Sequence, residues 1–502
     1  MKIYSRINFY TTALCLAAAC VATQKPNILF IAVDDLKPTL SAYGSKVNTP
    51  AMDRIAAQGT TFLNAHCQQA VCGPSRASIM TGRYPDFTKV WDLKTKIRSI
   101  HPDIQTLAEY FKNNGYHAVG MGKIFDPRSV DKGSDKRSWS VPYSQTWHLD
   151  YNSATGKPKA HYHNPKSKQM AAHLSNSNWN ALNKKLFQGE AWPVVEAEAV
   201  PDDAYDDGAI AAHAVKTLSK LAQKRQPFFL AVGFKKPHLP FVAPKKYWDL
   251  YDRTAIELAP FQAAPKGAPS YALHDGSELR SYNGIPAQGP IDAATQRELI
   301  HGYYACVAYI DAQIGKILDQ LETLGLAENT IIALWGDHGW HLGDHGLWCK
   351  HTNYEQATRV PLMISAPGNK AQTTSMPAEL VDLYPTLCDL AGIPLPNHFD
   401  GISLAPTIHD KNQLTREFAI SQFPRGKKMG YALRNERYRF VAWFETGGDG
   451  AKPGDQITAT ELYDYTDDPL EQRNLVKDPH YKAVASQLSK KLFRFINTFK
   501  NI

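Results

Sequence analysis

The sequence predicts an α/β protein built on a large, mostly parallel sheet with helices on both faces. Three continuous apolar runs, "NILFIAVDD" (27–35), "FFLAVGF" (228–234) and "TIIALWGDHG" (330–339), are typical of buried parallel strands. Residues 208–222 and 295–324 carry apolar side chains at helical spacing between these runs. Strands that alternate with helices indicate parallel pairing and helices that cover the sheet.

Polar side chains follow the apolar runs at the points where the strands should end. Asp34 and Asp35 follow the first run, His238 follows the second, and Asp337 and His338 lie within the end of the third. In open α/β sheets ligands bind beyond the carboxyl ends of the strands. We therefore expect these five side chains to meet at one edge of the sheet.

Two other segments depart from this alternation. Residues 127–200 are rich in Ser, Asn, Lys, His and Trp without sustained periodicity, which predicts an insertion. We expect the insertion to interrupt a main domain at 26–410. From about residue 415 the pattern becomes short strands followed by an amphipathic helix at 480–497, which predicts a small antiparallel subdomain over 415–502.

The N-terminus has the features of an export signal. Lys2 and Arg6 precede the short apolar run "TTALCLAAACVATQ", which predicts a signal peptide over residues 1–22 and a periplasmic or secreted protein. Cys20 is equally consistent with the acylated cysteine of a lipoprotein. The run is too short to cross a bilayer, and no later stretch qualifies as a transmembrane segment.

Charge and cysteine usage exclude some functions. Removal of residues 1–22 lowers the net charge from +8 to +6, because only Lys2 and Arg6 leave. The excess is spread out, without the basic cluster typical of nucleic-acid binding, and it suits an anionic small molecule or glycan. The remaining cysteines are odd in number and scattered, so no disulfide framework is predicted.

Adjacent carboxylates at one strand end and an Asp-His pair at another predict a cation site. Asp34 and Asp35 concentrate negative charge, which is costly unless a cation is present. Asp337 and His338 add a third carboxylate and an imidazole. Three carboxylates favour Ca²⁺ or Mg²⁺ over zinc.

Cys72 begins a Cys-Gly-Pro-Ser-Arg turn that precedes a predicted helix. Pro74 suits a first helical turn, and the unpaired N–H groups at a helix N-terminus favour negative charge. Cys67 lies five residues back, which fits neither a redox motif nor a zinc pair. The spacing predicts a single functional cysteine beside an anion-binding position.

These motifs resemble the type I, formylglycine-dependent sulfatases. "VCGPSRASIMTGRYP" (71–85) matches the C-x-P-S-R-x-x-x-x-T-G-R motif of that family. Five further stretches are also similar, most of all to the iduronate-2-sulfatase-like branch: "NILFIAVDDLKPTLSAYG", "VGFKKPHLPF", "GDHGWHLGDHGLWCK", "ATRVPLMISAPG" and "ELYDYTDDPLEQRNL". The similarity covers nearly all of 26–475 except 127–200 and 255–290. It implies an alkaline-phosphatase-like fold.

The resemblance also implies a reaction and two cofactors. A separate formylglycine-generating or sulfatase-maturing enzyme would oxidise Cys72 to formylglycine (3-oxoalanine), whose hydrate attacks the sulfur of a sulfated carbohydrate. Ca²⁺ would be held by Asp34, Asp35, Asp337, His338 and the modified Cys72. Arg76 would stabilise the hydrated aldehyde, Lys123 and Lys350 would bind sulfate oxygens, and His238 would protonate the departing sugar oxygen.

One position departs from the branch. Asp126 stands where the branch usually has a histidine on the formylglycine hydroxyl, and we expect Asp126 to act as a base there, with His117 or His341 as substitutes. Five side chains are candidates for sugar binding because they lie near the motifs: Lys89, Arg98, Trp340, His341 and Trp348.

Two alternatives to a glycan sulfatase remain open. One is a phosphate or phosphonate monoester hydrolase of the same superfamily, and the other is a glycan-binding pseudoenzyme. The sulfated sugar, the sulfate position (a uronate 2-sulfate is one candidate), exo or endo action and the oligomeric state are left open by the sequence.

Overall fold

A computed structural model describes residues 25–145, 162–175, 192–396, 399–446 and 453–499. The predicted signal peptide and Cys20 lie outside the described residues, as does part of the 127–200 insertion. No helix among these residues is long and apolar enough to span a membrane.

The predicted sheet is present and contains seven strands. Its order is β13-β2-β12-β9-β1-β6-β3; β12 is antiparallel to its two neighbours, and the other six strands are parallel. The strands are β1 (Asn27–Val33), β2 (Gly59–His66), β3 (His117–Gly122), β6 (Phe228–Phe234), β9 (Thr330–Gly336), β12 (Arg359–Ser365) and β13 (Gln372–Glu379). The prediction of a mostly parallel sheet is confirmed.

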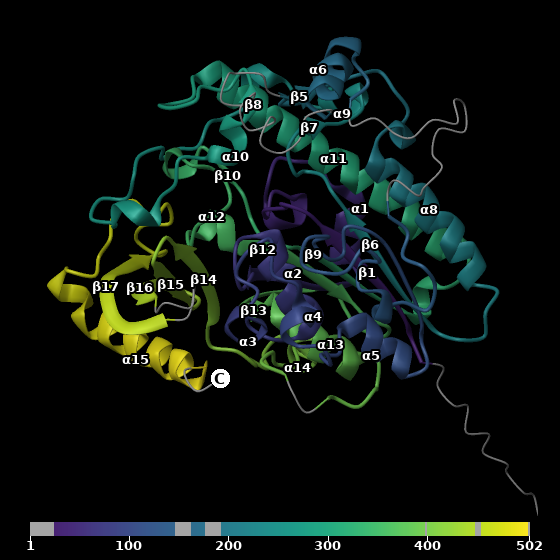
Figure 1. Ribbon diagram of the computed structural model, residues 1–502. Helices are drawn as coiled ribbons and strands as arrows, with labels where there is room; N and C mark the ends of the chain where they lie inside the picture. Colours follow the sequence, from purple (N-terminus) through teal and green to yellow (C-terminus); the bar gives the residue numbers. More distant parts are fainter. Residues whose placement is uncertain (1–24, 146–161, 176–191, 397–398, 447–452, 500–502) are drawn as a thin grey trace, which may run out of the picture.

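Helices cover both faces of this sheet (Figure 1). One face packs against α1 (Pro50–Ala56), α8 (Asp206–Leu221) and α11 (Ala293–Thr323). The other face packs against α2 (Cys72–Thr81), α5 (Leu107–Asn113) and α13 (Leu383–Leu390). The two predicted helices, 208–222 and 295–324, therefore correspond closely to α8 and α11.

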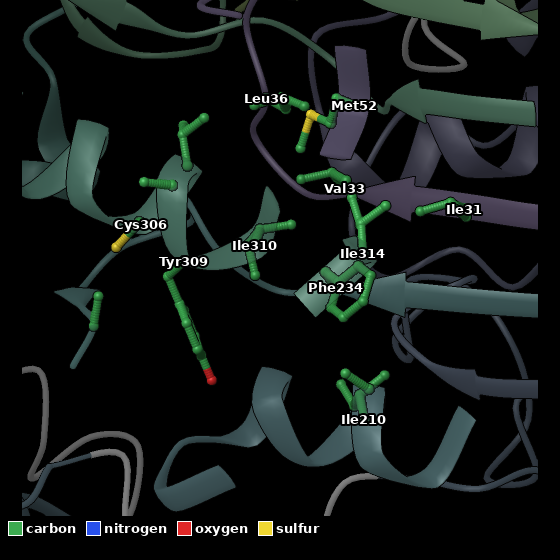
Figure 2. Close-up of a cluster of buried hydrophobic side chains, with 14 of the residues drawn as sticks. Ile31, Val33, Leu36, Met52, Ile210, Phe234, Cys306, Tyr309, Ile310 and Ile314 are labelled. Atoms are coloured by element: carbon green, nitrogen blue, oxygen red, sulfur yellow. The ribbon is translucent and has the colours of Figure 1, made fainter. Parts of the chain in front are cut away.

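Strand β1 supplies both cores, because its side chains alternate between the two faces. Leu29, Ile31 and Val33 join one hydrophobic cluster, whereas Ile28 and Phe30 join the other. Figure 2 shows Val33 beside Ile314 of α11, in the cluster that also contains Ile31 and Ile210 of α8. A continuous apolar run was the sequence signal for this arrangement, since a strand covered on both faces has no polar side.

The C-terminal region forms the predicted antiparallel subdomain. Strands β14 (Ala419–Arg425), β15 (Lys428–Arg434), β16 (Tyr438–Thr446) and β17 (Pro453–Asp464) pair in order. Helix α15 (Lys482–Phe499) packs along them through Leu488, Leu492 and Ile496 (Figure 1). The predicted closing helix, 480–497, is shifted by two residues.

The described parts of the 127–200 insertion are attached to the main body rather than forming a separate flap. Trp139 is buried in the same core as α2 and α5, and Trp192 packs against the other core. Short elements complete the fold: α3 (Pro85–Thr88), α4 (Ile97–Ile100), α6 (Pro165–Ser175), α9 (Lys245–Trp248), α10 (Ser277–Arg280), α12 (Glu355–Thr358), α14 (Ala405–His409), β4 (Trp192–Pro193), β5 (Val195–Glu196), β7 (Phe241–Val242), β8 (Tyr282–Asn283), β10 (His341–Leu342) and β11 (Trp348–Cys349).

The central position of β1 predicts that its side chains contribute strongly to stability. Ile31→Ala should lower the free energy of unfolding by about 2–5 kcal/mol, because it leaves a cavity between the sheet and α11. Ile457→Ala, a matched change at a side chain that is 41% exposed, should change it by less than about 0.5 kcal/mol. Thermal and denaturant unfolding measure both, and equal losses would contradict the two-sided core.

Candidate active site

Two adjacent strands bring the predicted cation ligands together. Val33 at the end of β1 is the register partner of Gly336 at the end of β9, so the residues that follow each strand emerge side by side. The backbone N–H of Asp35 donates to Oδ1 of Asp337 at 2.9 Å, and Nε2 of His338 lies 3.2 Å from Oδ1 of Asp35. The side chains of Asp34, Asp35, Asp337 and His338 are all buried.

Lys123 is placed by the next two strands of the sheet. Gly122 at the end of β3 pairs with Gly233 of β6. A Cβ atom on Gly233 would lie 2.2 Å from the carbonyl carbon and oxygen of Lys123, so glycine is required for this approach. Lys123 binds the Asp34 carboxylate, and its Nζ lies 3.5 Å from Sγ of Cys72.

Cys72 is the first residue of α2 and lies among these groups. Its Sγ is 3.3 Å from Nε2 of His338 and 4.0 Å from Oδ1 of Asp35, and the residue is 2% exposed. Burial, and then the negative charge of Asp34, raise the pKa of the Cys72 thiol well above its usual range. An unmodified thiol here would stay protonated and would be a poor nucleophile.

Arg76 ties the two acidic strand ends together one helical turn after Cys72. Its Nη2 donates to Asp34 at 2.9 Å and its Nε donates to Asp337 at 2.8 Å, and all three side chains are almost fully buried. Its remaining nitrogen, Nη1, donates to the carbonyl oxygens of Lys123 and Ile124. Burial alone would raise the pKa of Asp34, but Lys123 and Arg76 outweigh it and hold that pKa well below its usual range.

The donor set fits a divalent cation. Ligand atoms of Asp34, Asp35, Cys72 and His238, and of Cys72, Asp337 and His338, lie within 4.8 Å of one another in two overlapping groups. Burial raises the pKa of Asp35 to about 7 although Lys350 and His338 oppose it, so its charged form requires more positive charge than these side chains supply. A cation bound there would provide it.

Lys350 and His238 complete the cluster from two different loops. The β10–β11 hairpin ends at Cys349, and Nζ of Lys350 lies 3.0 Å from both carboxylate oxygens of Asp35. His238 hydrogen-bonds the carbonyl oxygen of Leu239 through Nδ1 at 2.7 Å, which directs Nε2 towards Asp35 at 3.8 Å. Burial, and then Lys350, lower the pKa of His238 to about 4.

Glu278 also joins this cluster, and the sequence did not indicate it. One carboxylate oxygen lies 3.3 Å from Nε2 of His238, and Nζ of Lys350 is 3.4 Å from the same group. Glu278 comes from α10, inside the stretch 255–290 that lacks resemblance to the sulfatases. A single glutamate in an aperiodic segment carries no signal that would distinguish it from a solvated loop residue.

The sequence predicted a contact between Asp126 and residue 72, and no such contact is found among the described residues. The Asp126 carboxylate binds Arg128 instead, with Nε at 2.9 Å and Nη2 at 2.7 Å, and it also accepts the backbone N–H of Arg128. Burial alone would raise the pKa of Asp126, but these contacts and the charge of Lys123 outweigh burial and lower that pKa. Both oxygens are therefore engaged by a neighbour two residues away.

The proposed substitutes for that position lie elsewhere. His117 begins β3, at the opposite end from Lys123, roughly 20 Å away at about 3.3 Å a residue. His341 is fully buried and its Nε2 hydrogen-bonds Thr352 at 2.9 Å.

Most of the side chains predicted to bind sugar are buried or paired with other side chains of the chain. Trp340 and Trp348 are buried, and the Trp340 ring lies under Nζ of Lys350 at 5.0 Å, so it supports the lysine from behind. Arg98 binds the carboxylates of Asp135 and Glu109, which the insertion and α5 supply. Nζ of Lys89 lies 5.7 Å from the centre of the Trp91 ring.

A large cavity is found away from this cluster. It has a volume of about 870 Å³ and is lined by residues of β13, of 411–417, of 435–438 and by Lys491, none of which belongs to the predicted site. The residues of the predicted site do not line this cavity.

Comparison with known proteins relates the whole chain to one family. The sulfatase family matches residues 26–393, and the family described as N-sulphoglucosamine sulphohydrolase, C-terminal, matches 343–498. Iduronate 2-sulfatase of Mus musculus is 34% identical, with 93% of this chain and 94% of that protein covered.

Two solved structures share the fold. BT4656 in complex with its substrate D-glucosamine-2-N,6-O-disulfate has a TM-score of 0.71 at 21% identity, covering 95% of this chain and 98% of that chain. The phosphonate monoester hydrolase of Agrobacterium radiobacter also has a TM-score of 0.71, at 22% identity, covering 94% and 96%. At these identities the likeness extends to the fold.

The buried position of Arg76 predicts a large loss of stability when its charge is removed. Arg76→Met should lower the free energy of unfolding by about 3–5 kcal/mol in metal-free protein, because Asp34 and Asp337 lose their buried partner. Arg54→Met is the matched control, since Arg54 pairs with Asp319 and Glu322 at the surface and should cost about 1 kcal/mol or less. Denaturant unfolding compares them, and a cost at Arg76 no larger than at Arg54 would contradict its assigned role.

Proposed function

This chain belongs to the sulfatase family, and we propose that it hydrolyses sulfate esters on a sulfated carbohydrate through a formylglycine made from Cys72. The observation that carries the proposal is the environment of Cys72. The residue lies at the start of α2 against His338 and Lys123, with a thiol whose pKa is raised. A group that is inert as a thiol yet surrounded by catalytic side chains suits a precursor.

A modified residue and a cation are part of this proposal. Formylglycine at position 72 would supply a hydrated aldehyde hydroxyl as the nucleophile. Asp34, Asp35, Asp337 and His338 would hold a divalent cation, which would neutralise the carboxylates and polarise that oxygen. We assign the cation as Ca²⁺ because three of the four side chains offer carboxylate oxygens. Conversion of Cys72 requires a formylglycine-generating or sulfatase-maturing enzyme as a partner.

The chain's own side chains hold and orient the ester. Lys123 and Lys350 lie on either side of the acidic pair, one on Asp34 and the other on Asp35, so that two ammonium groups face the sulfate oxygens. Both lysines counter the charge that develops on those oxygens. Arg76 fixes Asp34 and Asp337, and through them the position of the nucleophile at residue 72.

His238 is the candidate acid for the departing sugar oxygen. Its Nδ1 is committed to the Leu239 carbonyl, so Nε2 is the nitrogen that would give up a proton. Although burial lowers the pKa of His238, a sulfate ester bound between Lys123 and Lys350 brings negative charge that favours the protonated ring. Asp126, which binds Arg128, is assigned a structural role in place of the base expected from its position.

We further propose that the protein is exported, because residues 1–22 have the charge and apolar run of a signal peptide. A periplasmic or secreted protein, free or anchored through Cys20, would meet extracellular glycans. The likeness to iduronate 2-sulfatase makes a uronate 2-sulfate one candidate substrate.

A second candidate function is hydrolysis of a phosphate or phosphonate monoester, because a phosphonate monoester hydrolase has a similar fold. Assays with matched sulfate and phosphate esters distinguish the two candidate functions. Wild-type protein from its native host should release sulfate from sulfated glycans and from an aryl sulfate faster than phosphate from the matching aryl phosphate. Cys72→Ala should lose this activity at least about a thousandfold, since the nucleophile is removed.

The control for that variant is Cys388→Ala, which changes another buried cysteine in the α13 core. It should keep turnover near the wild-type value. Faster release of phosphate than sulfate, or full activity in Cys72→Ala, would refute the proposed reaction.

Removal of the cation gives an independent prediction. A chelator should abolish sulfate release, and Ca²⁺ should restore it better than Zn²⁺, because the site offers mostly carboxylate oxygens. Asp35→Asn should lower the bound metal measured by elemental analysis, whereas Asp319→Asn, at a surface carboxylate paired with Arg54, should leave it unchanged. Full activity in metal-free protein would refute the cation site.

A further inference from the structure

Glu278 is a carboxylate that the family motifs do not supply, and it lies against two members of the proposed site. Its contacts are with Nε2 of His238 at 3.3 Å and Nζ of Lys350 at 3.4 Å. The segment that carries it, α10, follows Gly276, whose φ of 71° turns the chain towards β11. Glu278 therefore lies beside the proposed site without being part of the motifs that predicted it.

The exposure of the side chains shows that Glu278 lies at the mouth of the cluster. The side chains of Glu278 and His238 are 25% and 27% exposed, whereas that of Lys350 is 4% exposed and those of Asp34, Asp35 and Asp337 are buried. Of these side chains, His238 and Glu278 are therefore the ones nearest to solvent. The sulfate would occupy the deeper part between the two lysines.

Geometry also connects Glu278 to the sugar itself. A sugar oxygen that takes a proton from Nε2 of His238 lies at hydrogen-bond distance from that atom, about 3 Å. The Glu278 carboxylate lies 3.3 Å from the same nitrogen, so a hydroxyl on the neighbouring sugar carbon falls within its reach. An ionised carboxylate accepts hydrogen bonds and donates none.

Glu278 carries its negative charge when the site is formed. Its carboxylate lies 3.4 Å from Nζ of Lys350, and this ion pair favours the ionised form. A substrate carboxylate brought to this side would meet like charge in a partly buried position, which is unfavourable. A hydroxyl there would instead donate a hydrogen bond.

We propose that Glu278 is a specificity-determining residue that accepts a hydrogen bond from a sugar hydroxyl beside the sulfate ester and disfavours a uronate carboxylate at that side. This inference rests on the proposed function and narrows it. The substrate class is a sulfated sugar that presents a hydroxyl, and no carboxylate, to α10 beside the ester.

Binding to an unreactive protein tests the proposal directly. The Cys72→Ala protein is titrated by calorimetry with methyl glucoside 4-sulfate and methyl glucuronide 4-sulfate. The two sugars differ only at C5, next to the sulfated position, which bears CH₂OH in one and a carboxylate in the other. Cys72→Ala should bind the glucoside more tightly than the glucuronide, and adding Glu278→Gln should reduce that ratio about tenfold, since the repelling charge is gone.

Two further variants separate recognition from structure. Cys72→Ala with Glu278→Asp should keep part of the preference, because the charge is retained on a shorter side chain. Cys72→Ala with Glu298→Gln changes a surface carboxylate of α11 that pairs with Arg253, and it should keep the full ratio. Thermal unfolding of each variant shows that the fold is kept.

The outcomes separate this proposal from the proposed function. An unchanged glucoside-to-glucuronide ratio in the Glu278→Gln protein, an equal loss of affinity for both sugars, or no binding of either sugar to Cys72→Ala would each overturn the role of Glu278. Binding with the expected change of ratio, in a protein whose wild type releases no sulfate, would overturn the sulfatase reaction and leave the recognition by Glu278 standing.

Discussion

The site depends on one buried interaction, the bridge that Arg76 makes between Asp34 and Asp337. Two carboxylates at the ends of neighbouring strands would repel each other in a dry environment, and each would be costly to bury alone. The guanidinium lies between them with a separate N–H for each. Its remaining donors bind the carbonyl oxygens after β3, so a single side chain connects the ends of β9, β1 and β3.

The rest of the arrangement follows from that bridge and from the parallel sheet. Strands β9, β1, β6 and β3 are neighbours and run in one direction, so the residues after each strand emerge at one edge. Helix α2 carries Arg76 and Cys72 one turn apart, so anchoring Arg76 also fixes Cys72. Lys123 and Lys350 then pair with Asp34 and Asp35, and the oxygens of these carboxylates lie near enough to Cys72 and His238 to share a cation.

Much of this architecture was predictable from sequence because it is encoded locally. The apolar runs predicted β1, β6 and β9, and the polar residues that follow them predicted the edge where the site lies. The turn at 72–76 predicted the start of α2. Side-chain partners were less predictable: Asp126 matched a functional position in the chain, yet Arg128 two residues later binds both of its oxygens.

The other predicted site residues show how folding decides the partners of a side chain. Trp340, Trp348 and His341 adjoin the motif lysine in sequence, but the β10–β11 hairpin turns them into the core behind it. Arg98 is engaged by Asp135, a partner that only the folded insertion brings near. Glu278 could not be found because its position follows from how an aperiodic segment packs against Lys350 and His238.

The central claim is that Cys72 is the precursor of the nucleophile, and the mass of its peptide tests this most directly. Protein purified from its native host is digested, and the peptide that contains Cys72 is measured by mass spectrometry. Conversion to formylglycine replaces CH₂SH by CHO and lowers the mass by about 18 Da relative to cysteine. The account predicts that loss in the active protein; an unmodified Cys72 thiol in protein that hydrolyses sulfate esters would contradict it.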